Sequence, residues 1–160
     1  MILDLIRTKR AVREFATEAV PDDIVREILE AGRLAQSSKN DQPWHFVLIH
    51  DRETLRQLST CGRYAGHLAG ANFAVALVIQ PGYDFDMGQA AAYMQLAAWD
   101  RGVASCIASM WEPDKAKAIL GIPADKQFDT AISFGYPTRK PGKIKDRRPL
   151  DEVVHVEKWD

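Results

Sequence analysis

The sequence contains only two cysteines, Cys61 and Cys106, and they lie far apart along the chain. Neither belongs to a CxxC pair and no cluster of metal-ligating residues accompanies them, so a disulfide scaffold and a metal site are both disfavoured. We expect both to be buried thiols. Long apolar runs are also lacking, since the longest, Phe73–Ile79, is far shorter than the roughly 20 residues that span a bilayer. We therefore expect no membrane association.

An excess of charge of one sign is absent as well. The 21 basic and 22 acidic residues give a formal net charge of -1, and the pI is about 6.4. Nucleic-acid binding favours a broad basic surface and a high pI, so this class of partner is disfavoured. The start lacks the charged, apolar and small-residue regions of a signal peptide, which predicts a cytoplasmic protein. With 160 residues, 46% of them hydrophobic, the chain fits one globular domain over 1–160.

Helical and strand patterns alternate along the chain. Pro21 and the acids after it are typical of a helix start, and an apolar stripe of Ile24, Ile28, Leu29 and Leu34 follows. Further helices are predicted over 2–6, 53–58, 86–101 and 113–120, and strands over 45–50, 73–79, 104–110 and 130–136. This alternation favours an α/β or α+β fold with helices packed on a sheet.

The predicted helix over 86–101 is apolar on nearly every side. Its strong helix formers end at Gly102, which suits a helix C-terminus. A helix of this kind is typical of the centre of a fold or of a dimer interface.

Basic residues collect near both ends of the chain. The first cluster consists of Arg7, Lys9, Arg10 and Arg13. The second cluster consists of Arg139, Lys140, Lys143, Lys145, Arg147 and Arg148. A small dianion such as a phosphate monoester needs only a few converging cations, preferably arginines that can make two hydrogen bonds. The alternative is that both clusters are solvated surface, which is the usual role of a charge run.

A polar loop over 35–44 links the helix that begins near Pro21 to the next strand. Ser37, Ser38, Asn40 and Gln42 offer groups that both donate and accept hydrogen bonds, which suits the polar edge of a heteroaromatic ring. Loops in this position commonly carry sites. The alternative is that these residues make only local turn hydrogen bonds.

Five segments together resemble the nitroreductase family of FMN-dependent oxidoreductases, and the resemblance covers almost the whole chain. They are KRAVREF, AQSSKNDQPWHFVLI, LAAWDRGVASC, LGIPADKQFDTAISFGYP and KDRRPLDEVVH. Each is weak alone, but their order and spacing together are specific. The resemblance implies an α+β fold with a central mixed or antiparallel sheet flanked by helices, and a tail that is domain-swapped in a homodimer.

The resemblance also implies which residues bind FMN. The N-terminal motif and the C-terminal K-x-R would converge on the phosphate, the polar loop would reach the flavin from the partner subunit, and 106–109 would supply backbone groups near the ring. The cofactor-binding residues implied in this way are Lys9, Arg10, Ala11, Arg13, Ser37, Ser38, Asn40, Gln42, Cys106, Ile107, Ala108, Ser109, Lys145 and Arg147.

The activity implied by the resemblance is transfer of a hydride from NADH or NADPH to FMN, followed by reduction of a nitroaromatic, a quinone or a similar small acceptor in a ping-pong mechanism. Flavin N5 would be the reactive atom, so no catalytic side chain is predicted. Another flavin activity on the same fold, such as dehalogenation or flavin fragmentation, and a non-catalytic FMN-binding or storage dimer remain alternatives.

The sequence departs from the family pattern at several positions. Ala11 stands where serine is common, Gln36 replaces a proline, and no glycine follows Cys106 near the ring. The chain is also short, with little room for inserted helices over the substrate pocket. His67 and His155 are not assigned a catalytic role.

Overall fold

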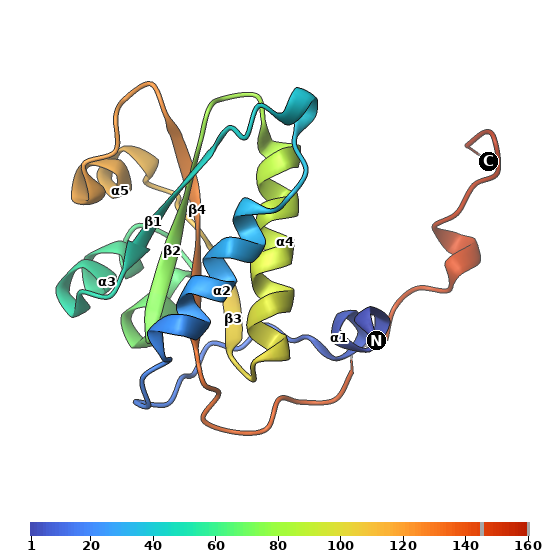
Figure 1. The fold of residues 1–160 in the computed structure, drawn as a ribbon, viewed down its shortest axis with the longest axis horizontal. Coiled ribbons are helices and arrows are strands. Elements are labelled where there is room, and N and C mark those ends of the chain that lie inside the picture. The colour runs from blue at the N-terminus through green and yellow to red at the C-terminus, as the bar shows by residue number, and fades with distance from the viewer. Residues whose placement is uncertain (145, 160) are drawn as a thin grey trace.

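The computed structural model describes residues 1–144 and 146–159, and most of these form a three-layer α+β fold (Figure 1). The helices are α1 (Ile2–Thr8), α2 (Asp22–Arg33), α3 (Arg52–Ser59), α4 (Asp84–Asp100) and α5 (Pro113–Leu120), with short 3-10 turns η1 (Ser38–Asn40), η2 (Ala65–Gly70) and η3 (Leu150–Glu152). The strands are β1 (Trp44–Ile49), β2 (Phe73–Ile79), β3 (Ala104–Ser109) and β4 (Gln127–Gly135). The predicted elements are confirmed, with boundaries shifted by a few residues.

The four strands form one sheet in the order β1-β2-β4-β3, and every neighbouring pair is antiparallel. The α+β prediction is therefore confirmed. A parallel contact occurs outside the sheet, as an isolated bridge between Ala11 and Ser105. Strand β2 is buried along its whole length, as expected for a central strand that is apolar throughout. Strand β3 lies at an edge.

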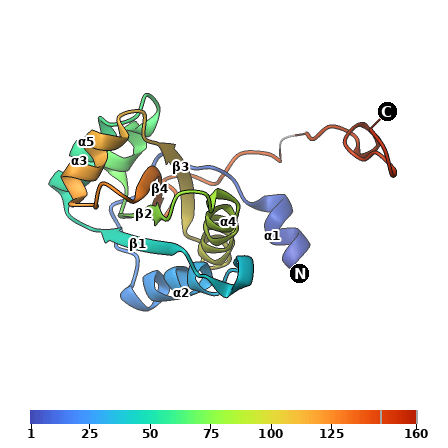
Figure 2. The same cartoon turned by 90° about the horizontal axis from the view of Figure 1, so that it is seen from above.

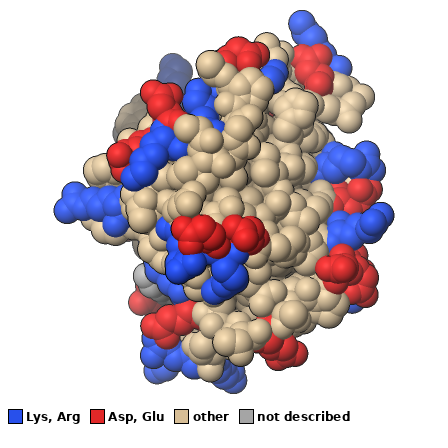
Figure 3. All heavy atoms as spheres, turned by 90° about the vertical axis from the view of Figure 1, so that its left-hand side faces the viewer, with Lys and Arg blue, Asp and Glu red and all other residues tan. Residues whose placement is uncertain are grey.

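Helices cover both faces of the sheet (Figure 2). On one face α2 and α4 pack over a core in which the rings of Phe73 and Phe134 stack with centroids 4.8 Å apart. On the other face α3, η2 and α5 pack over a core that includes Cys61. Both cysteines are buried thiols, as predicted, and burial raises the pKa of each. Figure 3 shows basic and acidic side chains interspersed on the side of the molecule where α3 and α5 lie.

The apolar stripe of α2 differs in two positions from the prediction, which omitted Val25 and included Leu34. Val25 and Ile28 are buried, and Ile24 and Leu29 pack against them as partly buried residues. Leu34 was wrongly included, because the helix ends at Arg33 and the Leu34 side chain is 62% exposed. The helical period stops at the helix end, so the next apolar residue no longer faces the core.

Helix α4 is buried on one side only within this chain. Ala90, Met94 and Ala98 face the core, whereas Phe85 and Tyr93 are exposed. The predicted burial of this helix is therefore confirmed for its inner face alone. Its outer face is exposed within this chain.

The two ends of the chain extend beyond the three layers. Helix α1 stands apart from the core, and the C-terminal tail runs away from it (Figures 1 and 2). Apolar side chains at both ends are exposed, among them Ile2, Ile6, Val156 and Trp159. In the described part of the chain, no helix has both the length and the apolar character required to cross a bilayer.

One glycine permits a close approach at the end of β3. A Cβ atom added at Gly62 would overlap with the carbonyl oxygen of Ser109. We expect Gly62→Ala to lower the free energy of unfolding by about 1–3 kcal/mol, because the loop must move off the strand. Gly66→Ala is the matched control, since a Cβ there meets no atom within 4 Å. Urea unfolding measures both, and equal stability of the two variants would contradict this packing.

Candidate functional site

The basic segment after α1 lies along the open edge of the sheet. The Val12 amide donates to the Ser105 carbonyl at 3.0 Å, and the isolated bridge to Ser105 is parallel. Before this contact, Trp99 Nε1 donates to Thr8 Oγ1 at 3.1 Å, which holds the end of α1 beside the C-terminal end of α4. The segment therefore follows β3 in the same direction.

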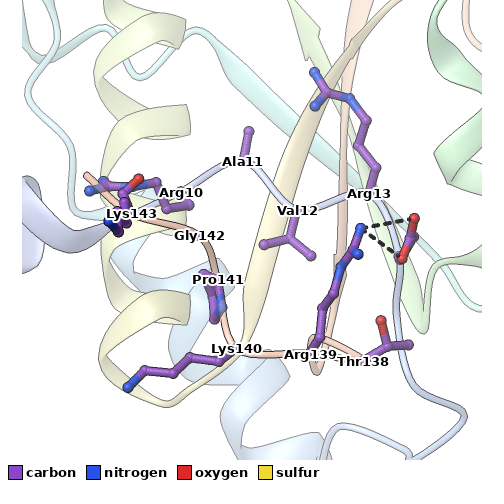
Figure 4. Close-up of a pocket in the computed structure, with 11 residues that line it drawn as sticks. Arg10, Ala11, Val12, Arg13, Thr138, Arg139, Lys140, Pro141, Gly142 and Lys143 are labelled. Atoms are coloured by element: carbon purple, nitrogen blue, oxygen red, sulfur yellow. Dashed lines mark hydrogen bonds and ion pairs between the residues drawn. The ribbon is translucent and has the colours of Figure 1, made fainter. Parts of the chain in front are cut away.

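The side chains of this segment point in different directions (Figure 4). Ala11 and Arg13 point to one side and Val12 to the other, as alternation in an extended chain requires. Arg10 is directed toward Lys143, and its Nε donates to the Lys143 carbonyl at 3.4 Å. The structure thus joins the start of the chain to the second basic cluster, while it separates the side chains of Arg10 and Arg13.

A cationic hollow of about 360 Å³ lies between these two segments. Its charged residues are Arg10, Arg13, Glu14, Arg139, Lys140 and Lys143. Arg139 forms an ion pair with Glu14 at 3.4 Å, marked by dashed lines in Figure 4. The lining carries five cations against one carboxylate, so the hollow attracts anions.

Lys9 and Arg13 lie near the centre of β3. Burial lowers the pKa of Lys9, and the neighbouring Cys106 opposes this effect. The charges of Arg13 and Lys9 likewise oppose the rise that burial causes in the pKa of Cys106. Lys9, Arg13 and Cys106, three of the predicted FMN-binding residues, are therefore close in space. An anion there would relieve the cost of keeping the Lys9 ammonium partly buried.

His67 adds a buried imidazole to this group. Its Nδ1 lies 2.8 Å from Ser133 Oγ, which donates to the Cys106 carbonyl at 3.2 Å. Nε2 has no hydrogen-bond partner among the described residues. Burial, and after it the charge of Arg13, lower the pKa of His67. This group could not be predicted from the sequence, because 66 positions separate His67 from Ser133.

The outer edge of β3 is accessible beside these side chains. Ile107 is 48% exposed and Ser109 is exposed, although Ala104 to Cys106 and Ala108 are buried. Ser105 turns its carbonyl outward to Val12, so the alternation of an antiparallel ladder also turns the backbone groups of Ile107 and Ser109 outward. Of the predicted residues 106–109, two therefore offer backbone donors at an open edge, and two face the core.

The predicted polar loop lies between α2 and β1 and has an unusual backbone. Lys39, Asn40 and Gln42 have φ values of 50°, 60° and 50°, in the left-handed region that non-glycine residues seldom adopt. Among the hydrogen bonds that hold it, the Ser38 amide donates to Asp86 Oδ2 at 3.0 Å, and the Gln42 amide donates to Ser37 Oγ at 2.9 Å. Strain of this kind persists where the surroundings fix it, and such segments cluster at binding sites.

The loop lies far from the basic edge of its own chain. Ser38 is bonded to Asp86 near the start of α4, whereas α1 is bonded to Trp99 near its end. The rise of an α-helix between these two positions is about 20 Å. Within one chain, the structure does not bring Ser37, Ser38, Asn40 and Gln42 together with Lys9, Arg10 and Arg13.

The C-terminal candidates are placed only in part. Lys145 lies outside the described residues. Arg147 lies in the exposed C-terminal segment, and its Nη1 donates to the Asp146 carbonyl at 3.4 Å. The bond from Arg10 to Lys143 brings the chain that precedes Arg147 to the basic edge.

An antiparallel sheet with an accessible edge strand and a neighbouring cationic hollow defines the class of this protein, an α+β fold with a surface that attracts anions. The particular family is given by comparison with known proteins: residues 6–74 and 79–136 match the model of the nitroreductase family, and the chain belongs to this family.

Relatives and solved structures agree with this assignment. A protein from Archaeoglobus fulgidus with the provisional name NADH dehydrogenase/NAD(P)H nitroreductase is 31% identical, over 98% of both chains. A protein of Thermus thermophilus named NADH dehydrogenase is 27% identical, over 91% of both. The fold is similar to an FMN-dependent nitroreductase of Clostridium difficile, with a TM-score of 0.89, 24% identity, and coverage of 98% of this chain and 99% of that one.

Proposed function

We propose that this protein is an FMN-dependent NAD(P)H oxidoreductase that reduces a nitroaromatic, a quinone or a similar small acceptor. The observation that carries the proposal is the accessible edge of β3 flanked by cations, in a chain of the nitroreductase family. Relatives named as NADH dehydrogenase or NAD(P)H nitroreductase support the donor.

The residues at this edge fit the phosphate of FMN. A dianion needs several converging cations, and Arg10, which follows Lys9 in the sequence, lies where the N-terminal segment meets Lys143. We assign the phosphate to the end of the edge where Arg10 meets Lys143. Lys145 and Arg147 from the C-terminal cluster are assigned to the same phosphate. Ala11 offers no hydroxyl there, so backbone groups and cations carry the binding.

The residues farther along the edge fit the flavin ring. Exposed Ile107 provides an apolar surface for a planar ring, and the outward amides of Ile107 and Ser109 provide donors for its polar edge. Cys106 and Ala108 support this surface from the core side. Arg13 lies next to His67 and Cys106, on the face of the sheet opposite to the Ile107 side chain, and we assign it to the ring edge and not to the phosphate.

Bound FMN supplies the redox chemistry, by accepting a hydride from NADH or NADPH and passing the electrons to the acceptor. The protein orients the reactants and keeps positive charge and amide donors beside the ring, which stabilises negative charge that develops there. No side chain is assigned a proton-transfer role.

We further propose that the site is completed by a second copy of the chain. Helix α4 leaves Phe85 and Tyr93 exposed, and the tail exposes Val156 and Trp159. A two-fold axis near the middle of α4 would place the polar loop of one subunit near the basic edge of the other. Ser37, Ser38, Asn40 and Gln42 would then reach the flavin from the partner, and the tail would be exchanged between subunits.

Anaerobic mixing with NADPH or NADH tests the enzymatic proposal. We expect the flavin absorbance of the FMN-loaded protein to bleach within seconds and to return when a nitroaromatic or quinone is added. A storage dimer would keep its oxidised absorbance. Bleaching followed by recovery only with a halogenated aromatic, or by breakdown of the flavin, would support the alternative activities on this fold.

A further inference from the structure

A cationic and aromatic cluster borders the proposed ring site. The Arg63 guanidinium carbon lies 5.4 Å from the ring centroid of Tyr64 and 5.8 Å from that of Trp111. The two rings meet edge to face with centroids 6.5 Å apart. Tyr64 is 70% exposed and Trp111 is 61% exposed. Two large rings and an arginine are therefore assembled at the surface and not in the core.

The backbone under this cluster is fixed to the end of β3. The amides of Trp111 and Glu112 donate to the Cys61 carbonyl at 2.8 and 3.0 Å, and the Met110 amide donates to the Asp129 carbonyl at 2.7 Å. Cys61 itself is buried. The cluster is thus held in a defined position relative to Ser109, at the accessible edge.

The hollow beside this cluster is positively charged. It is lined by Arg13, Arg63, Tyr64, Gly66 and His67, and none of these described residues is acidic. The hollow shares Arg13 and His67 with the proposed ring site, so it lies directly next to that site.

Arg63 has an exposed side chain beside these rings. Among the described residues, the ion pairs do not include Arg63. The Arg63 guanidinium lies over the faces of both rings, and its N–H groups lie in the guanidinium plane. Such a group can make a bidentate contact with a carboxylate.

We infer that Arg63, with Tyr64 and Trp111, forms a subsite that selects aromatic acceptors bearing a carboxylate. This rests on the proposed function, because the acceptor must lie over the ring site. The rings of Tyr64 and Trp111 contact the aromatic body of the acceptor, and Arg63 binds its carboxylate. Arg13 adds a second positive charge to the same hollow.

The phosphate groups of NADPH offer similar anionic chemistry, but the acceptor fits the geometry better. The 2′-phosphate of NADPH lies on the adenosine ribose, remote from the nicotinamide that must reach the flavin. A carboxylate on the acceptor ring lies only one ring width from the reacting group. The hollow directly adjoins the ring site, so it suits the shorter separation.

The test compares 4-nitrobenzoate with the uncharged 4-nitrobenzyl alcohol on the oxidised, FMN-loaded protein, in which neither compound reacts. We expect Arg63→Gln to weaken binding of 4-nitrobenzoate about tenfold in calorimetry, the scale of a charge-assisted hydrogen bond in a solvated site. Binding of 4-nitrobenzyl alcohol should stay unchanged. Arg63→Lys should lose less, since it keeps the charge without the planar fork. Arg26→Gln, a change of an exposed arginine on α2, is the control.

Turnover then provides a second measure. Arg63→Gln should raise KM for 4-nitrobenzoate by a similar factor, while NADPH still bleaches the flavin as in the parent protein. Equal effects on the two nitroaromatics, or no effect on either, would overturn the acceptor subsite. A loss confined to NADPH, with NADH and 4-nitrobenzoate unaffected, would also overturn it and assign Arg63 to the donor phosphate. Absence of bleaching in the parent protein refutes the proposed function alone, because the binding comparison needs no reduction.

Discussion

Lys9→Met should weaken binding of FMN by about 1.5–3 kcal/mol, the scale of hydrogen bonds to charged groups, and leave binding of riboflavin unchanged. The reason is that riboflavin has the same ring but no phosphate. Fluorescence titration of the apoprotein with each flavin measures both affinities. Methionine has a similar length, so the variant removes the charge and little of the volume.

The same substitution should not destabilise the apoprotein. Burial lowers the pKa of Lys9, so the folded state disfavours its charged form. The unfolded chain then binds more protons between the lowered pKa and the ordinary value of 10.5, and this lysine makes stability rise with pH in that range. Lys9→Met should remove this contribution, as urea unfolding at several pH values would reveal.

Lys115→Met provides the matched control. Lys115 lies on α5, where it pairs with Glu112 at 3.4 Å on the surface, and such pairs contribute little to stability. Arg13→Ala offers a contrast, because a residue at the ring edge should affect FMN and riboflavin alike. If Lys9→Met weakens both flavins equally and Arg13→Ala weakens only FMN, the assignment of the two ends is reversed.

The sequence predicted the elements better than their arrangement. Strands and helices that alternate along the chain suit parallel βαβ units as well as an antiparallel sheet, and the apolar pattern of Phe73–Ile79 is compatible with both. Strand order depends on contacts between distant segments, such as Ala104 with Gly135. The resemblance, and not the periodicity, favoured the antiparallel possibility.

The candidate site was predictable where it lies in continuous motifs. The segment from Lys9 to Arg13 and the loop from Ser37 to Gln42 could be proposed from the sequence, because each is a continuous motif that resembles one of the family. Groups assembled across the fold were not found. His67 meets Ser133, and Arg63 meets Trp111, only because η2 packs beside β3 and β4. Contacts between segments that are distant in the sequence cannot be predicted from local sequence patterns.

Mixing two inactive variants should restore activity if the flavin site is shared between subunits. Asn40→Ala removes the side chain expected from the partner, and Arg13→Ala removes one expected from the chain that holds β3. In a heterodimer one site collects both defects and the other collects neither. Random exchange of a one-to-one mixture should therefore make roughly a quarter of all sites intact, whereas each variant alone has none.

Asn40 and Arg13 lie far apart within one chain, so restored activity in the mixture requires that the two residues come from different subunits. Asn40 lies beside the start of α4 and Arg13 follows α1, which is bonded near the end of α4. Since that part of the helix rises about 20 Å, one subunit alone cannot bring both side chains to one ring.

Partial denaturation and refolding allow exchange, and native mass spectrometry verifies that heterodimers form. Light scattering should find dimers at micromolar concentration, and a monomer that retains FMN would refute the shared site. Heterodimers whose FMN is reduced by NADPH no faster than in the separate variants would show that Asn40 and Arg13 do not serve one flavin from different chains.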